Sequence, residues 1–182
     1  MKKLTCRLLV LAVMLLAIGA EAFADVAINE TNFPDVNFRE YVKDNIDSNN
    51  DDVLDGAEIG ITTSMDVSYK SISSLKGIEF LVKLTHLNCS HNKLSGLDVT
   101  QNTALKVLDC SSNQLVILYL DENWALEKIF CDNNRLKNLS LRRFSSSNET
   151  LRTLHCFNNR FHAVQLGNYF RALEELYCDF PV

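Results

Sequence analysis

Five cysteines recur along this chain at nearly constant steps, and apolar residues recur in the same frame around each of them. The steps between Cys89, Cys110, Cys131, Cys156 and Cys178 are 21, 21, 25 and 22 residues. In the first of these units the frame consists of Leu84, Leu87, Cys89, Asn92, Leu94 and Leu97. An upstream unit over residues 65–81 has the same apolar frame without a cysteine. Such self-similarity predicts one small structural unit repeated along a stack.

A single unit of this size cannot bury its apolar face, whereas three or more stacked units share a continuous core. Each unit is expected to contain a short strand whose alternate residues, such as Leu87 and Cys89, point inward. The expected strands are centred near Asp66, Asn88, Asp109, Phe130, His155 and Tyr177. Polar and apolar residues alternate over 97–99, 118–120 and 139–141, which predicts extended rather than helical return segments.

An asparagine follows each of the first four cysteines by three residues, at positions 92, 113, 134 and 159. Its side chain can bond turn backbone groups that have no strand partner, so we expect a ladder of asparagines inside the bend.

The cysteines have three interpretations: small apolar core residues, a partial set of disulfides, or a metal site. Neighbouring strands lie about 4.8 Å apart, and a disulfide brings Cβ atoms to about 3.8 Å, so the spacing favours core residues.

The pattern L-x-x-L-x-C-x-x-N-x-L over residues 65–178 resembles the short cysteine-containing leucine-rich repeats of secreted and surface proteins in gut and oral bacteria, which are relatives of the internalins. Residues 72–81 resemble the opening unit of such proteins. The resemblance implies binding to proteins or host surfaces. The expected fold is a leucine-rich-repeat solenoid with short parallel strands on the concave face, a strand-like or irregular convex side, and a small helical N-terminal cap.

Three regions are expected: a signal peptide over 1–24, a cap over 25–60, and repeats over 61–182. Lys2, Lys3 and Arg7 precede an apolar run over 8–18, and Ala22-Phe23-Ala24 has the small-x-small pattern of a cleavage site. The run is shorter than the roughly 20 residues that span a membrane. We therefore expect a secreted or surface-exposed protein with no later membrane segment. The acidic balance of the chain, −5, argues against nucleic-acid binding.

A twelve-residue acidic loop follows a predicted amphipathic helix over 34–46. It matches the oxygen ligands of an EF-hand loop at Asp47, Asn49, Asp51, the Val53 carbonyl, Asp55 and Glu58. Asp52 stands where such loops place glycine. The sequence predicts one structural calcium ion here. The alternative is a capping box, in which Asp55 begins the next helix and Glu58 is its partner.

Outward-facing strand positions should line the concave surface, and its second half is aromatic. The predicted partner-binding residues are Phe130, His155, Phe157, Tyr177, Asp109 and Lys128. The expected partner is an unidentified protein or cell-surface ligand. A self-associating structural surface component stabilised by calcium is the alternative. The chain is expected to be a monomer or an edge-paired dimer, and a monomer would argue against self-association. No catalytic residues are expected, because His86 and His155 fall three strands apart.

Overall fold

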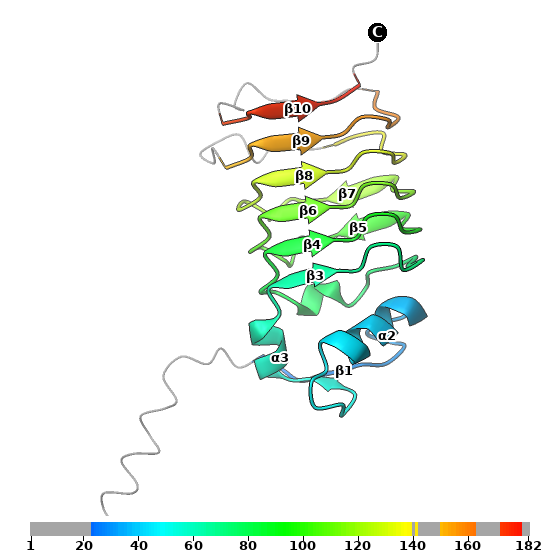
Figure 1. The fold of residues 1–182 in the computed structure, drawn as a ribbon, viewed down its shortest axis with the longest axis vertical. Helices are drawn as coiled ribbons and strands as arrows, with labels where there is room; N and C mark the ends of the chain where they lie inside the picture. The colour runs from blue at the N-terminus through cyan, green and yellow to red at the C-terminus, as the bar shows by residue number, and fades with distance from the viewer. Residues whose placement is uncertain (1–22, 140, 142–149, 163–171, 180–182) are drawn as a thin grey trace, which may run out of the picture.

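The structure is a computed structural model, and it describes residues 23–139, 141, 150–162 and 172–179. Six of its described strands stack as one parallel sheet in the order β10-β9-β8-β6-β4-β3 (Figure 1). These strands are β3 (Ser64–Asp66), β4 (His86–Asn88), β6 (Val107–Asp109), β8 (Lys128–Phe130), β9 (Thr153–His155) and β10 (Glu175–Tyr177). Each contains the position at which the sequence predicts a strand. The leucine-rich-repeat solenoid is thereby confirmed.

The core of the solenoid lies directly behind this sheet. Leu87, Leu108 and Ile129 are the middle residues of neighbouring strands, pair in register, and are almost fully buried. Cys89 and Cys110, two residues further along, are completely buried as well. Alternate side chains of a strand point to opposite faces, so the first and last residue of each strand remain on the outward side. We call this outward side the sheet face.

The asparagine ladder is present as expected. The Asn113 amide donates to the carbonyls of Cys89, Cys110 and Ser111 at 3.0–3.1 Å, and its oxygen accepts from the Leu94 amide at 3.0 Å. Equivalent bonds are made by Asn92, Asn134 and Asn159. One side chain thus satisfies backbone groups of two successive units and holds them in register.

The side opposite the sheet face is strand-like in part. There β5 (Gly96–Asp98) and β7 (Ile117–Tyr119) pair in parallel, while the first unit has a 3₁₀ turn, η1 (Ile78–Phe80), on the same side. A second asparagine ladder, which the sequence analysis missed, lies on this side. Asn102 donates to the carbonyls of Ile78 and Leu81, and Asn123 donates to those of Val99 and Asn102.

The N-terminal cap consists of β1 (Val26–Ala27), α2 (Val36–Asn45), β2 (Val53–Leu54) and α3 (Gly56–Ile61). The strands β1 and β2 pair antiparallel. Helix α2 buries Phe38 and Val42, and Ile46 is buried just beyond its end, so the predicted apolar face is confirmed. The Asp35 side chain accepts the Phe38 amide at 3.1 Å and so caps the first turn of α2.

Phe33 of the cap covers the apolar edge of the first repeat. Its ring is fully buried, 5.9 Å from the ring of Phe80 in η1. Gly77 is needed at this contact, because a Cβ there would lie 2.3 Å from the Phe33 ring and its φ is +107°. Asp35 adds a polar link, since its second carboxylate oxygen accepts from the Ser73 amide at 2.8 Å and the Ser73 hydroxyl at 2.6 Å. The cap is therefore joined to the stack by both apolar and charged contacts.

The cysteines fulfil two of the three interpretations. Cys89, Cys110 and Cys131 are free and buried in the core. Cys156 and Cys178 form a disulfide with Cα atoms 4.8 Å apart, so the preference for core residues throughout is wrong at this pair. Cys178 follows the last described strand and is only partly buried, which leaves its side chain room to turn toward Cys156. The predicted signal peptide falls almost wholly outside the described residues.

Candidate functional site

Three aromatic rings lie side by side across neighbouring strands of the sheet face. Phe130, His155 and Tyr177 are the last residues of β8, β9 and β10 and pair in register. The His155 ring is edge-to-face against Phe130, with centroids 4.9 Å apart, and against Tyr177, with centroids 4.6 Å apart. Tyr177 is 54% exposed. We call these three residues the aromatic row, and their mutual contacts hold the rings in a fixed arrangement.

His155 sits between two carboxylates. Its Nδ1 is 3.9 Å from Asp132 Oδ2, and its Nε2 is 3.4 Å from Glu175 Oε1. The second distance is within reach of an ion pair, yet Nε2 has no partner with hydrogen-bond geometry among the described residues. Burial raises the pKa of the Asp132 carboxyl, and the hydrogen bond from the Phe157 amide and the charge of His155 oppose that rise. The two carboxylates therefore place negative charge on either side of His155, the middle ring of the aromatic row.

The structure separates the other predicted contact residues. Phe157 is 39% exposed and lies two residues beyond the aromatic row, where its amide donates to Asp132 Oδ1 at 2.9 Å. Asp109 is in register with Phe130, but its carboxylate accepts the Ser111 amide and hydroxyl at 3.0 and 2.6 Å. Lys128 begins β8 and is exposed at the other end of the strands. The predicted set therefore contains one contiguous aromatic group with polar neighbours on either side.

Asp132 and Glu175 were absent from the predicted set, although both contact the aromatic row. The alternation that directs Phe130 outward also directs Asp132 outward, so its placement could be read from the sequence. Its proximity to His155 depends on the register of β8 and β9 across a 25-residue step, which no periodicity specifies. His86 lies on β4, three strands from His155 on β9, as expected.

The first half of the sheet face is polar and satisfied by local bonds. Asp66 Oδ1 accepts the Ser68 amide at 2.9 Å, and Asn88 Oδ1 accepts the Ser90 amide and hydroxyl at 3.1 and 2.7 Å. Groups that already bond to their own turn have less to offer a partner. The exposed apolar surface of the sheet face is concentrated around the aromatic row.

The predicted calcium loop adopts the capping box. Asp55 accepts the amides of Ala57 and Glu58, and Glu58 in turn accepts the Asp55 amide at 3.1 Å. Its other oxygen accepts the Ser48 amide, and Asp47 accepts the amides of Asp51 and Asp52. Asn49 and Asp51 accept loop amides in the same way, while Val53 enters β2. Across the described chain, no group of three or more His, Cys, Asp or Glu side chains is arranged to hold a metal ion.

The free cysteines are poorly suited to chemistry. Burial raises the pKa of the Cys89, Cys110 and Cys131 thiols far above the ordinary range. They stay protonated at neutral pH, and the nucleophilic and metal-binding form of cysteine is the thiolate. These side chains act as core residues.

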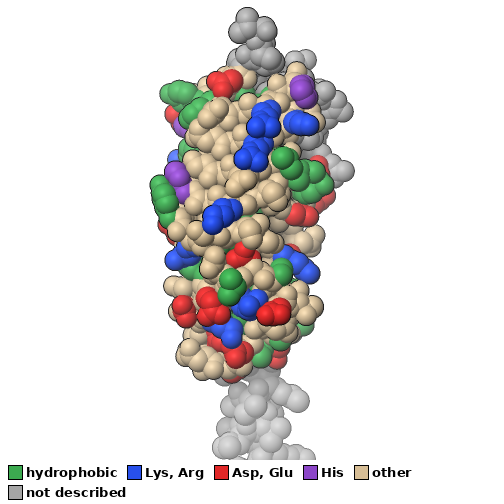
Figure 2. All heavy atoms as spheres, turned by 90° about the vertical axis from the view of Figure 1, so that its right-hand side faces the viewer, with side chains coloured by type: hydrophobic (Ala, Val, Ile, Leu, Met, Phe, Trp, Pro, Cys, Tyr) green, Lys and Arg blue, Asp and Glu red, His purple; other side chains and the backbone are tan. Residues whose placement is uncertain are grey.

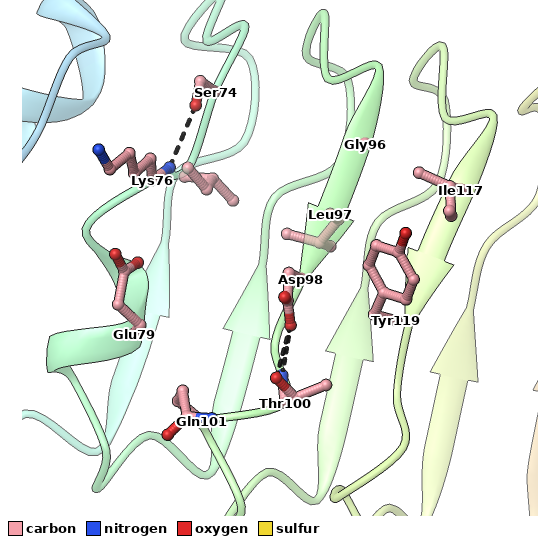
Figure 3. Close-up of a pocket in the computed structure, with 11 residues that line it drawn as sticks. Ser74, Lys76, Glu79, Gly96, Leu97, Asp98, Thr100, Gln101, Ile117 and Tyr119 are labelled. Atoms are coloured by element: carbon pink, nitrogen blue, oxygen red, sulfur yellow. Dashed lines mark hydrogen bonds between the residues drawn. The ribbon is translucent and has the colours of Figure 1, made fainter.

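A groove of about 460 Å³ lies on the opposite side of the solenoid, lined by residues 74–76 and 79 of the first unit and by the strands β5 and β7 (Figure 3). Ile117 and Tyr119 project into it from β7, and Lys76 and Glu79 flank it. Asp98 is occupied by the Thr100 amide and hydroxyl at 2.9 and 2.7 Å. None of the predicted contact residues line this groove, and its lining includes no histidine or cysteine.

Comparison with known proteins supports the repeat assignment. A leucine-rich-repeat family model matches residues 83–101. Over 71 residues, 39% of this chain, the sequence is 37% identical to Internalin J of Listeria monocytogenes serotype 4b (strain F2365) and covers 8% of it. The solved functional domain of InlJ from Listeria monocytogenes, which includes a cysteine ladder, is similar with a TM-score of 0.75 and 30% identity, over 88% of this chain and 34% of that chain.

A crystal structure of an internalin (inlF) from Listeria monocytogenes is similar with a TM-score of 0.58 and 19% identity, over 84% of this chain and 52% of that chain. The chain thus spans well under two thirds of the length of each relative. Its repeats are internalin-like, and Cys89, Cys110 and Cys131 form a ladder of the kind named for InlJ. Within the described residues no helix has the length and apolar character to cross a membrane.

Proposed function

We propose that this chain is an extracytoplasmic binding protein that recognises a protein partner through the sheet face, with the aromatic row at the centre of the contact. The observation that carries the proposal is the contiguous packing of Phe130, His155 and Tyr177 on a rigid sheet. Aromatic residues dominate the binding energy of protein interfaces, because they bury a large area at little cost in side-chain entropy. Similarity to internalins agrees with a binding role rather than a catalytic one.

The surroundings of the aromatic row add specificity to this contact. Asp132 and Glu175 flank His155, while Lys128 is exposed two residues before Phe130, at the other end of β8. A partner that covers the rings must therefore place complementary polar groups at the rim, where charges select the partner more than they add affinity. The exposed Phe157 extends the apolar area on one side.

The test is capture of a partner from host or neighbouring-cell extracts on the immobilised chain, followed by affinity measurements on the captured protein. Tyr177→Ala removes the most exposed ring and should weaken binding at least about tenfold. Tyr119→Ala is the matched control, since this tyrosine is similarly exposed, 45%, on the opposite side of the solenoid. Equal affinity of the Tyr177 variant and the parent chain would exclude the aromatic row as the contact.

Light scattering of the same preparations addresses the alternative of a self-associating surface component. A dimer that persists on dilution and is lost in the Tyr177 variant would place a second copy, rather than another protein, on the sheet face. A monomer at high concentration would leave the heterologous partner as the interpretation.

As a secondary role we propose that residues 47–58 bind one calcium ion that stabilises the cap. In support of this, Asp47 and Glu58 are buried carboxylates in one short loop. Asn50 and Asp52 have positive φ values of 58° and 62°, which suit a tight turn around a cation. Affinity in the millimolar range is expected, as for other extracellular modules.

Thermal unfolding with calcium and with chelator tests the calcium role. Calcium should raise the unfolding temperature of the parent chain, and Asp51→Asn should reduce that rise while leaving the Asp55–Glu58 capping box intact. An unfolding temperature that does not respond to millimolar calcium would remove this role and leave the capping box as the sole function of the loop.

A further inference from the structure

Four segments that follow sheet strands contain no carboxylates, and three of them carry cations. Segments 91–97, 112–118, 133–139 and 158–162 contain no Asp or Glu, although the chain has 23 acidic residues against 18 basic ones. Lys93, Arg135, Lys137 and Arg160 are all exposed there, and we call these four residues the basic edge. Figure 2 looks onto this side of the solenoid and shows Lys and Arg side chains gathered over its upper part, while acidic side chains gather at the lower end.

Backbone hydrogen bonds between successive turns fix the positions of these cations. The Arg135 amide donates to the Leu115 carbonyl, and the Arg160 amide to the Leu136 carbonyl, both at 2.9 Å. Arg135 and Arg160 occupy the same position in neighbouring units, and Lys93 occupies it two units before Arg135. With a step of about 4.8 Å between strands, the charges form a line of about 14 Å along the stack.

No described carboxylate pairs with the four cations. The opposite edge of the same sheet is different, because Lys106 Nζ lies 3.6 Å from Glu127 Oε1 and Arg152 Nη1 lies 2.6 Å from Glu174 Oε1. Cations that are close together and unpaired repel one another, and they attract a ligand that carries several negative charges. The cations Lys106 and Arg152 are therefore neutralised by carboxylates of the chain itself, whereas the basic edge can pair with an external anion.

A flat aromatic surface adjoins the lower end of the basic edge. Tyr69 and His91 occupy the same turn position in the first two units, with φ values of 56° and 55°. Their rings are stacked with centroids 4.2 Å apart and an interplanar angle of 9°, and Tyr69 is 74% exposed. His91 is two residues before Lys93. The apolar face of a sugar ring packs well on such an exposed aromatic plane.

We propose that the basic edge binds a linear anionic polysaccharide, with carboxylate or sulfate groups against the four cations and a sugar ring against Tyr69. Repeated charges along a polymer match the line of charges along the stack, which Gln114 interrupts in the third unit. Nucleic acid fits less well, because it presents about one charge per 1.7 Å of duplex and needs a broad basic surface, which a chain with net charge −5 does not offer. This site is separate from the aromatic row, which lies on the sheet face.

Binding of heparin and of polygalacturonate to the full mature chain tests the proposal, with neutral dextran and single-stranded DNA as comparison probes. Both anionic polysaccharides should bind, dextran should not, and added salt should weaken binding because the contacts are ionic. Arg135→Gln/Arg160→Gln should weaken binding about tenfold. Lys106→Gln/Arg152→Gln removes the same charge from the opposite edge and should leave binding unchanged. Tyr69→Ala should weaken polysaccharide binding while Tyr177→Ala does not.

Three results would overturn the proposal. Equal weakening by the two double variants would mean that net charge alone matters. Tighter binding of single-stranded DNA than of either polysaccharide would assign the basic edge to nucleic acid. An absence of binding to both polysaccharides at low salt, in a chain whose unfolding temperature is normal, would leave the basic edge without this ligand.

Discussion

The cap and the repeats use different side chains to pair the backbone groups of their turns. Both contain turns whose backbone amides lack secondary-structure partners. In the cap these amides donate to carboxylates, namely those of Asp35, Asp47, Asp51, Asp55 and Glu58. In the repeats the inner turn groups are satisfied by the asparagine side chains of the two ladders, and carboxylates accept only outer turn amides, at Asp66, Asp98 and Asp109 among others.

The difference lies in what each side chain can do. A carboxylate only accepts hydrogen bonds, carries charge and titrates, whereas an amide donates and accepts and stays neutral. Stacked amides can therefore be repeated without accumulating charge. Residues 25–62 of the cap contain ten acidic and two basic residues. We conclude that the repeats gain order from a neutral ladder, and that the cap gains it from charges that respond to solution conditions.

The largest expected effect tests the neutral ladder. Asn113→Ala should lower the free energy of unfolding by about 3 kcal/mol, because each buried backbone group left without a partner costs about 1–3 kcal/mol. Denaturant unfolding measures this loss. Gln114→Ala, at the exposed neighbouring position, should change stability by less than about 0.5 kcal/mol. If the two variants were equally stable, the ladder would not be the source of order in the repeats.

A smaller loss is expected at the junction between the two regions. Asp35→Ala removes the helix cap of α2 and the link to Ser73, and should destabilise the chain by about 1–2 kcal/mol. Asp44→Ala, on the exposed side of α2, serves as the control. Hydrogen exchange should show the loss first in residues 33–46, before the repeats. Uniform loss of protection along the chain would instead show that cap and repeats unfold as one unit.

The smallest effect is a difference in response to acid. Burial raises the pKa of Asp35, but the hydrogen bonds from Ser73, Phe38 and Ser74 outweigh it, so the pKa is lowered. The stability from Asp35 is present above its unfolded pKa of about 3.9 and is lost as the pH falls through the folded value. Asp132 in the repeats has a raised pKa, so its destabilisation at neutral pH is relieved by acid.

Hydrogen exchange between about pH 6 and pH 3 should therefore show the cap loosening as the pH falls below the unfolded pKa of about 3.9 toward the lower folded value of Asp35. Asp35→Asn should show a weaker pH response in the cap than the parent chain. Repeats that lose protection at a higher pH than the cap would contradict the comparison.

The repeats could be predicted in detail because one environment occurs many times. Leu87 and Leu108 occupy the same buried position in successive units, so the assignment of each supports the assignment of the other. The second ladder, at Asn102 and Asn123, was missed although its 21-residue step equals that of Cys89 and Cys110. These asparagines lie far from the cysteines that mark the repeat. They are recognised as a second repeat only when the outer segments of successive units are aligned with one another, as the strands are.

The cap and the aromatic row were harder to predict, because their contacts occur once. Asp35 meets Ser73 across 38 residues, and no pattern in the chain relates these two positions. The acidic loop matches an EF-hand and a capping box equally well by spacing. The structure contains the capping box, in which Asp55 and Glu58 satisfy amides at the start of α3, and calcium binding stays a prediction. The sequence predicts each of the three residues of the aromatic row, but the contacts between their rings depend on the register of β8, β9 and β10.

The bonds that Asn113 makes to two successive units also mean that each unit adds a fixed length to the solenoid. Each ladder asparagine copies the register of one unit onto the next, so an additional 21-residue unit would lengthen the stack without altering its neighbours. Every such duplication would carry the aromatic row and the upper cations about 4.8 Å further from the acidic cap. The number of units thus sets the distance from the acidic cap to the aromatic row and the upper cations. This distance can change only by whole units, and each surface stays intact.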